Sequence, residues 1–142
     1  MIVPDVNLLL YAHVTAFSEH ARARRWWESL MNGRQEVGLA APALFGFVRV
    51  ASNPRVLDRP LSVPAAVAYA EEWLGRPHVH FLQPGPRHLE IAFALLRQIG
   101  AAANLTTDAQ LAALAIEHQG EVHSNDSDFA RFPQLRWVNP IA

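Results

Sequence analysis

The sequence has no cysteine and no lysine, and each absence narrows the chemistry that the chain can perform. Without cysteine there is no disulfide and no thiolate metal site. Without lysine, all twelve basic residues are arginines, a bias that codon usage explains, although arginine also suits bidentate contacts with phosphate and carboxylate groups. The net charge is -1, so a surface for nucleic acid would have to gather its positive charge locally.

Long hydrophobic runs are also missing. The longest, Leu39 to Val48, contains a proline and a glycine and is far shorter than the roughly 20 residues of a membrane helix. Asp5 interrupts the apolar N-terminus, so no signal peptide is expected. With 142 residues, of which 51% are hydrophobic and 18% charged, we expect one globular domain over residues 1–142, cytoplasmic and without membrane contact.

Strand and helix patterns alternate along the chain. Strands are expected at residues 1–4, 37–40, 79–82, 121–123 and 136–138, helices at 7–13, 18–32, 42–52, 64–74, 86–99 and 107–118, and a tight helical turn at 126–132. Helix caps are expected at Ser18 and Thr107, and helix stops at Gly33, Gly75, Gly100 and Gly120. This alternation predicts an α/β fold, with a central parallel sheet of about five strands and helices on both faces.

Four aspartates are placed where such a sheet would bring them together. Asp5 directly follows the first strand, and Asp126 and Asp128 follow the strand at 121–123. Asp108 opens the helix that leads into that strand, and a helix running against the strands starts near their carboxyl ends. Because ligands of parallel sheets bind beyond the carboxyl ends of the strands, we expect these four carboxylates to converge on one site.

Converging carboxylates indicate a metal ion. They repel one another unless a cation lies between them, and oxygen ligands favour a hard ion such as Mg²⁺ or Mn²⁺. Such ions activate water and stabilise charge on a phosphodiester, which predicts a nuclease that leaves a 5′-phosphate if two ions bind. Each aspartate also has a structural explanation: Asp5 and Asp126 as helix caps, Asp108 through the helix dipole, and Asp128 as part of an ordinary polar loop. The joint pattern favours the metal site.

Four segments, in order along nearly the whole chain, resemble a known family. They are Ile2 to Asn7, Arg49 with Asn53 to Val56, Asn104 to Ala109, and Ser124 to Phe129. The chain resembles the PIN-domain toxins of VapBC toxin–antitoxin systems, the VapC family. The resemblance implies a PIN-like three-layer fold with a five-stranded parallel sheet and a Mg²⁺-dependent endoribonuclease that cleaves RNA. It also implies the toxin role in a type II toxin–antitoxin system, inhibition by a cognate VapB antitoxin, and a homodimer.

The same resemblance implies roles for individual residues. Asp5 and Asp108 would be the principal metal ligands, Asp126 would complete the acidic cluster, and Asp128 would support it. Asn7 would orient Asp5 or a water on the metal. Ser124 would hold a carboxylate by a hydrogen bond. The residues that bind the RNA are not identified.

Gly46 departs from the family pattern. Many PIN domains have a glutamate three residues before an arginine on the third helix, and counting back from Arg49 gives this glycine. We therefore expect one metal ion to be held well and a second only weakly. The structural explanation is that glycine allows close helix packing between Phe45 and Phe47.

Two other functions fit parts of the pattern. A phosphatase could use Asp5 as its nucleophile, but that chemistry usually needs a second acid two residues on, where this chain has Asn7, and a lysine, of which there is none. A catalytically impaired PIN-fold binding module would explain Gly46, although all four aspartates are retained.

Some apolar and aromatic residues could belong either to the core or to a contact surface. The run from Leu8 to Leu10 is expected in the core or in the homodimer contact. Of Trp26 and Trp27, one should be buried and the other exposed as an anchor for a partner. His13 lies near the first loop, at the core edge or in contact with RNA.

Overall fold

Five short strands form one parallel sheet. The computed structural model describes residues 1–100 and 103–142. The strands are β1 (Ile2–Pro4), β2 (Val37–Ala40), β3 (Val79–Leu82), β4 (Glu121–His123) and β5 (Arg136–Val138). They lie in the order β3-β2-β1-β4-β5, and every neighbouring pair is parallel, which confirms the predicted α/β sheet. Because β1 is the central strand, the residue that follows it lies in the middle of the row formed by the carboxyl ends of the strands.

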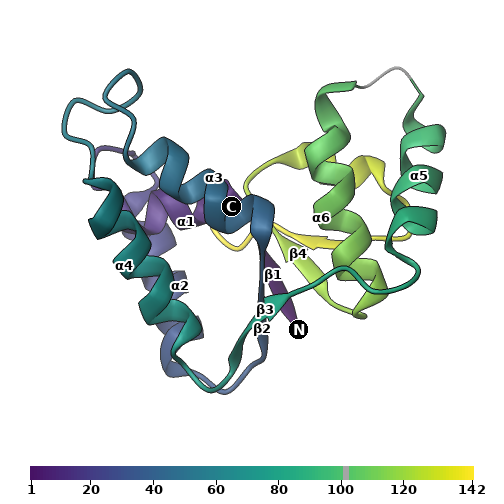
Figure 1. The fold of residues 1–142 in the computed structure, drawn as a ribbon, viewed down its shortest axis with the longest axis horizontal. Coiled ribbons are helices and arrows are strands. Elements are labelled where there is room, and N and C mark those ends of the chain that lie inside the picture. Colours follow the sequence, from purple (N-terminus) through teal and green to yellow (C-terminus); the bar gives the residue numbers. More distant parts are fainter. Residues whose placement is uncertain (101–102) are drawn as a thin grey trace.

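The helices cover both faces of this sheet, as predicted. They are α1 (Val6–His13), α2 (His20–Asn32), α3 (Ala41–Ala51), α4 (Val63–Leu74), α5 (His88–Ile99) and α6 (Thr106–Glu117). Figure 1 shows α1 to α4 on one side of the sheet and α5 and α6 on the other, which makes three layers. None of the helices in the described part of the chain combines the length and the apolar character needed to cross a membrane.

The core on the α1–α4 side is aromatic. Leu8 and Leu9 are fully buried there, which assigns the apolar run of α1 to the core. His13 lies among the rings of Trp27, Phe47, Tyr69 and Trp73. Its Nδ1–H donates to the Leu9 carbonyl oxygen at 2.7 Å. Burial lowers the pKa of this imidazole, and its ring contacts place it at the edge of this core.

The core on the α5–α6 side depends on small residues. Four alanines of α6 are fully buried: Ala109, Ala112, Ala113 and Ala115. Because alanine occupies little volume, α6 can pack closely against both β4 and α5. This packing brings the first turn of α6, which carries Asp108, to the edge of the sheet where β1 and β4 end.

All six predicted helix starts differ from the observed ones by one or two residues, and two of these differences involve a predicted cap. α2 begins at His20, and the Ser18 hydroxyl donates to the Glu19 carboxylate instead of capping the helix. α6 begins at Thr106, so Thr107 is its second residue and not its cap, and the short 3-10 helix η1 (Ala103–Leu105) precedes it. The helix stops at Gly33, Gly75 and Gly100 are confirmed, whereas α6 ends at Glu117, three residues before Gly120.

A candidate active site at the carboxyl ends of β1 and β4

Asp5 links the end of β1 to the start of α1. Its backbone N–H donates to the carbonyl oxygen of His123 on β4, at 2.9 Å. Its Oδ1 accepts from the N–H of Val6 at 2.8 Å, and its Oδ2 accepts from the hydroxyl of Ser124 at 2.8 Å. Burial raises the pKa of this carboxyl, the hydrogen bonds from Ser124 and Val6 oppose that rise, and the charge of Asp126 adds to it. Asp5 is therefore both a helix cap and a buried acid.

Ser124 connects the two strand ends. It is fully buried, and its Oγ accepts from Asn7 Nδ2 at 3.3 Å and from the backbone N–H of Asp126 at 3.0 Å while it donates to Asp5. Its carbonyl oxygen accepts from the indole N–H of Trp137 at 3.0 Å. The expected contact between Ser124 and a carboxylate is thus present, and the carboxylate is that of Asp5.

Asn7 contributes an unsatisfied polar atom. Its amide nitrogen donates to Ser124, whereas its Oδ1 is buried and has no hydrogen-bond partner in the described part of the chain. Buried polar atoms in native structures nearly always have a partner, so an orphaned acceptor indicates a missing donor or cation. Asn7 reaches Asp5 through Ser124 rather than directly.

Asp126 and Asp128 lie on the turn after β4. Asp126 caps the 3-10 helix η2 (Ser127–Arg131), and its Oδ1 accepts from the N–H of Asp128 at 2.9 Å. The predicted helical turn is therefore present, and Asp126 has a capping role in addition to its place among the acids. The N–H of Asp126 donates to Ser124, which fixes this turn to Asp5.

Asp108, in the first turn of α6, gives the electrostatic evidence that the four acids share one site. Burial raises the pKa of its carboxyl to about 6, and the charges of Asp5, Asp126 and Asp128 each add to the rise. Carboxylates far apart in the sequence therefore repel one another across this centre. A cation between them would relieve that repulsion.

The four acids do not yet form a closed metal site. Within residues 1–100 and 103–142, no three histidine, aspartate or glutamate side chains stand in an arrangement that could hold a metal ion. The donors nevertheless suit a hard cation, since they are carboxylate oxygens together with the orphaned amide oxygen of Asn7.

Gly46 lies where α3 approaches α1. A β-carbon at this position would be 3.0 Å from Cγ2 of Val6, which is tighter than an ordinary contact. Phe47 next to it is fully buried, whereas Phe45 is 73% exposed. The glycine therefore permits close helix packing, and α3 offers no acid to the site at this position.

One supporting contact was not predicted from the sequence. The indole N–H of Trp26 on α2 donates to Nδ1 of His123 at 3.2 Å, and Nε2 of His123 donates to Glu121 at 2.8 Å. Trp27 is the buried member of the tryptophan pair, and Trp26 is half-buried against the core, so it is not the free anchor that was expected. This contact joins α2 to β4 directly beside Ser124, and 97 residues separate its partners, so no local pattern reveals it.

Comparisons with known proteins agree with this architecture. The model of the PIN domain family matches residues 2–135. Ribonuclease VapC33 of Mycobacterium tuberculosis is 54% identical over 141 residues, which cover 99% of each chain. The solved structure of VapC20 of M. tuberculosis, a toxin that cleaves the sarcin-ricin loop, superposes with a TM-score of 0.70 at 19% identity, over 96% of this chain and 99% of that one. The VapBC2 complex of Rickettsia felis, bound to a DNA fragment from its promoter, also gives a TM-score of 0.70, at 16% identity over 97% of this chain and 98% of that one.

Proposed function

The chain belongs to the PIN-domain family, and we propose that it is a VapC-type ribonuclease whose active site consists of Asp5, Asp108, Asp126 and Asp128. The full-length similarity to VapC33 supports the ribonuclease activity and the toxin role in a type II toxin–antitoxin system. Within the structure, the observation that carries the site is the chain of hydrogen bonds from Asp5 through Ser124 to the N–H of Asp126. The pKa of Asp108, raised to about 6 by burial and by the charges of the three other aspartates, supports the inclusion of its carboxyl in the same cluster.

We propose Mg²⁺ as the cofactor, with Mn²⁺ as an effective replacement. Asp5, Asp108 and Asp126 would hold the ion, with Asp128 at the outer side of the cluster. The oxygen-only donor set and the unsatisfied Oδ1 of Asn7 support this assignment. When bound, such an ion lowers the pKa of water and stabilises the negative charge that develops on the phosphodiester.

The protein itself supplies orientation. The hydroxyl of Ser124 and the N–H of Val6 each bind one oxygen of Asp5, so this carboxylate is fixed in one rotamer before the ion arrives. Asn7 acts on Asp5 through Ser124. The capping bond from Asp128 holds one oxygen of Asp126, which ties the turn after β4 to the site. These bonds keep the acids of β1 and β4 in register with each other.

RNA is the proposed substrate and a VapB-type antitoxin the proposed inhibitor, since the related R. felis structure is a VapBC complex. We expect the antitoxin to lay an extended or helical segment across the acidic site, with a basic side chain facing Asp5 and Asp108. Because its proposed substrate is cellular RNA, we also propose that the protein acts in the cytoplasm. The two other functions considered, a phosphatase with Asp5 as nucleophile and an inactive binding module, are not favoured, because the related chain is a ribonuclease.

We propose a homodimer through an apolar surface formed by β3 and α5. Phe81, Leu89 and Phe93 are exposed by 48%, 62% and 52%. Phe81 lies on an edge strand, and it lines a shared hollow with Phe45 of α3. We call Phe45, Phe81, Leu89 and Phe93 the β3–α5 surface. Exposed aromatic residues gathered on one surface are typical of an interface, and most soluble oligomers consist of identical subunits.

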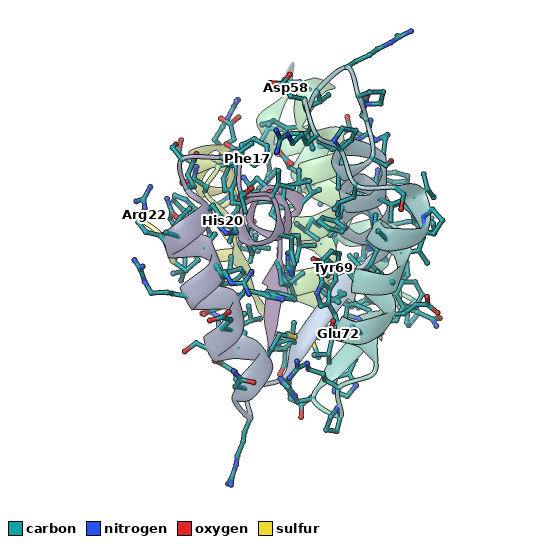
Figure 2. All side chains as sticks on the ribbon, turned by 90° about the vertical axis from the view of Figure 1, so that its left-hand side faces the viewer. Phe17, His20, Arg22, Asp58, Tyr69 and Glu72 are labelled. Atoms are coloured by element: carbon teal, nitrogen blue, oxygen red, sulfur yellow. The ribbon has the colours of Figure 1, made fainter. Side chains whose placement is uncertain are left out.

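Cleavage of RNA by purified protein in Mg²⁺ tests the proposed site, because the chain provides a matched control. Its fifth aspartate, Asp58, lies in the exposed loop between α3 and α4 (Figure 2). We expect Asp5→Asn and Asp108→Asn to lower the cleavage rate at least about a hundredfold, the upper end of what changes around metal ligands cost. Asp58→Asn should cleave like the parent.

The same variants expressed in a bacterial host give a second readout. The parent and Asp58→Asn should halt growth, and Asp5→Asn should restore it. If Asp5→Asn cleaves RNA and arrests growth like the parent, the proposed active site is wrong.

A further inference from the structure

An open hollow of about 570 Å³ lies between α3 and the start of α6, and the proposed mechanism does not use it. None of the four aspartates lines it. Gly46, Arg49 and Thr107 line it together with apolar walls. Thr107 directly precedes Asp108, so the hollow adjoins the site from the α6 side. Gly46 carries no side chain, which leaves the space next to Arg49 open.

Arg49 is the one charged residue among those that line this hollow. Its side chain is exposed, and it makes no hydrogen bond or ion pair with the rest of the described chain. Two other arginines pair with an acid four residues away: Arg24 on α2 with Glu28, and Arg76, just after α4, with Glu72. The position one turn before Arg49 is Gly46, so the guanidinium group has no acidic partner there.

We propose that this hollow is the subsite for the RNA nucleotide next to the scissile bond, and that Arg49 binds the phosphate of this nucleotide. The proposal rests on the proposed ribonuclease function and deepens it, since the residues that bind substrate are otherwise unassigned. Arg49 is a substrate-binding and positioning residue, and the chemistry at the scissile bond belongs to the aspartates.

The chemistry of the hollow matches such a ligand. A guanidinium group binds a phosphate through two parallel hydrogen bonds and keeps its charge at every working pH. The apolar walls formed by Pro42, Val48 and Val63 suit the face of an unstacked base, as in other sites for single-stranded RNA. The four nearby carboxylates repel a polyanion, so an unpaired cation at their margin offsets part of that repulsion for the incoming strand.

The contribution of Arg49 to RNA affinity can be measured in a chain that binds RNA without cleaving it. The probe is a fluorescein-labelled single-stranded RNA of mixed sequence, and its anisotropy is followed over a salt series with the Asp5→Asn chain. Adding Arg49→Ala should raise Kd about tenfold, as expected for losing a charged hydrogen-bonding partner. It should also reduce the slope of log Kd against log salt by about 0.7, the value for one phosphate contact on a single strand. Arg49→Lys should keep the slope and lose part of the affinity.

Arg34→Ala is the matched control. Arg34 is also an exposed arginine, but it precedes β2 and so lies at the opposite edge of the sheet from the aspartates. Its loss should change neither Kd nor the salt slope. Thermal melts of all variants should coincide, because neither arginine has a partner whose loss would affect folding.

The outcomes separate this inference from the proposed function. If the parent cleaves RNA but Arg49→Ala binds it like Arg34→Ala, the subsite is wrong while the ribonuclease stands, and Arg49 is then available to an acidic group of a protein partner. If Arg49→Ala lowers both affinity and slope while the parent fails to cleave RNA in Mg²⁺, the subsite stands and the proposed catalysis is wrong.

Discussion

At the scale of single residues, the charged carboxylate of Asp108 lowers the free energy of unfolding of the metal-free chain. Its pKa is about 6 in the folded chain and near 3.8 when unfolded, so its stabilising contribution is complete below 3.8 and is lost as the pH rises through 6. The shift corresponds to roughly 3 kcal/mol, and solvent screening of this half-exposed group reduces that to about 1 kcal/mol. In EDTA at pH 7, Asp108→Asn should therefore raise the free energy of unfolding by about 1 kcal/mol, measured by urea denaturation.

A lower pH and added Mg²⁺ should each reduce the stability advantage of Asp108→Asn over the parent. The advantage of Asp108→Asn should shrink as the pH falls from 7 toward 4, because the parent carboxyl then becomes neutral as well. Adding Mg²⁺ should stabilise the parent more than the variant, since only the parent retains the full ligand set. Asp58→Asn, in an exposed loop, should follow the parent throughout. If Asp108→Asn is less stable than the parent at pH 7 in EDTA, the repulsion among the four carboxylates described for this site is contradicted.

At the scale of elements, we expect the close approach of α3 to α1 at Gly46 to limit the number of metal ions that bind tightly. Titration of the free protein with Mn²⁺ should reveal one well-held ion and a second that binds weakly, because α3 has a glycine where an acid would complete the site. A glutamate at position 46 alone would crowd Val6, whose Cγ2 lies 3.0 Å from the added β-carbon. The double variant Val6→Ala with Gly46→Glu provides the room, and it should tighten the second site roughly tenfold.

Val6→Ala alone is the control for this titration, and it should leave the weak second site unchanged. Two tight sites in the parent would refute the role given to Gly46. A double variant that melts like Val6→Ala but binds no second ion would show that α3 does not face the metal at this position.

The elements also show which features the sequence can predict. Strand ends and helix periodicity are local, so all five strands and the arrangement of the four aspartates around two of them followed from short patterns. The start of α6 was misplaced because η1 precedes Thr106, and a 3-10 turn has no strong signal of its own. The contact between Trp26 and His123 and the orphaned oxygen of Asn7 depend on packing between distant segments, which no pattern along the chain reports.

At the scale of the whole molecule, we expect the β3–α5 surface to determine whether the chain is a monomer or a dimer. Sheets with an exposed edge strand are prone to association unless charge or proline protects the edge, and here the edge strand β3 presents Phe81, while Leu89 and Phe93 are exposed on α5. Burying these side chains against a second copy would remove this apolar area from water. We expect light scattering after gel filtration to give the mass of a dimer for the parent.

Phe93→Glu should convert that dimer to a monomer, because the interface would then have to bury two unpaired carboxylates, one from each copy. Val56→Glu is the matched control: Val56 is 55% exposed, but it lies in the loop between α3 and α4, outside the β3–α5 surface. That variant should remain a dimer, and the circular dichroism spectra of both variants should match that of the parent because the two positions are exposed in the single chain. A monomeric parent would refute the homodimer. A dimer that Val56→Glu disrupts and Phe93→Glu does not would place the interface away from β3 and α5.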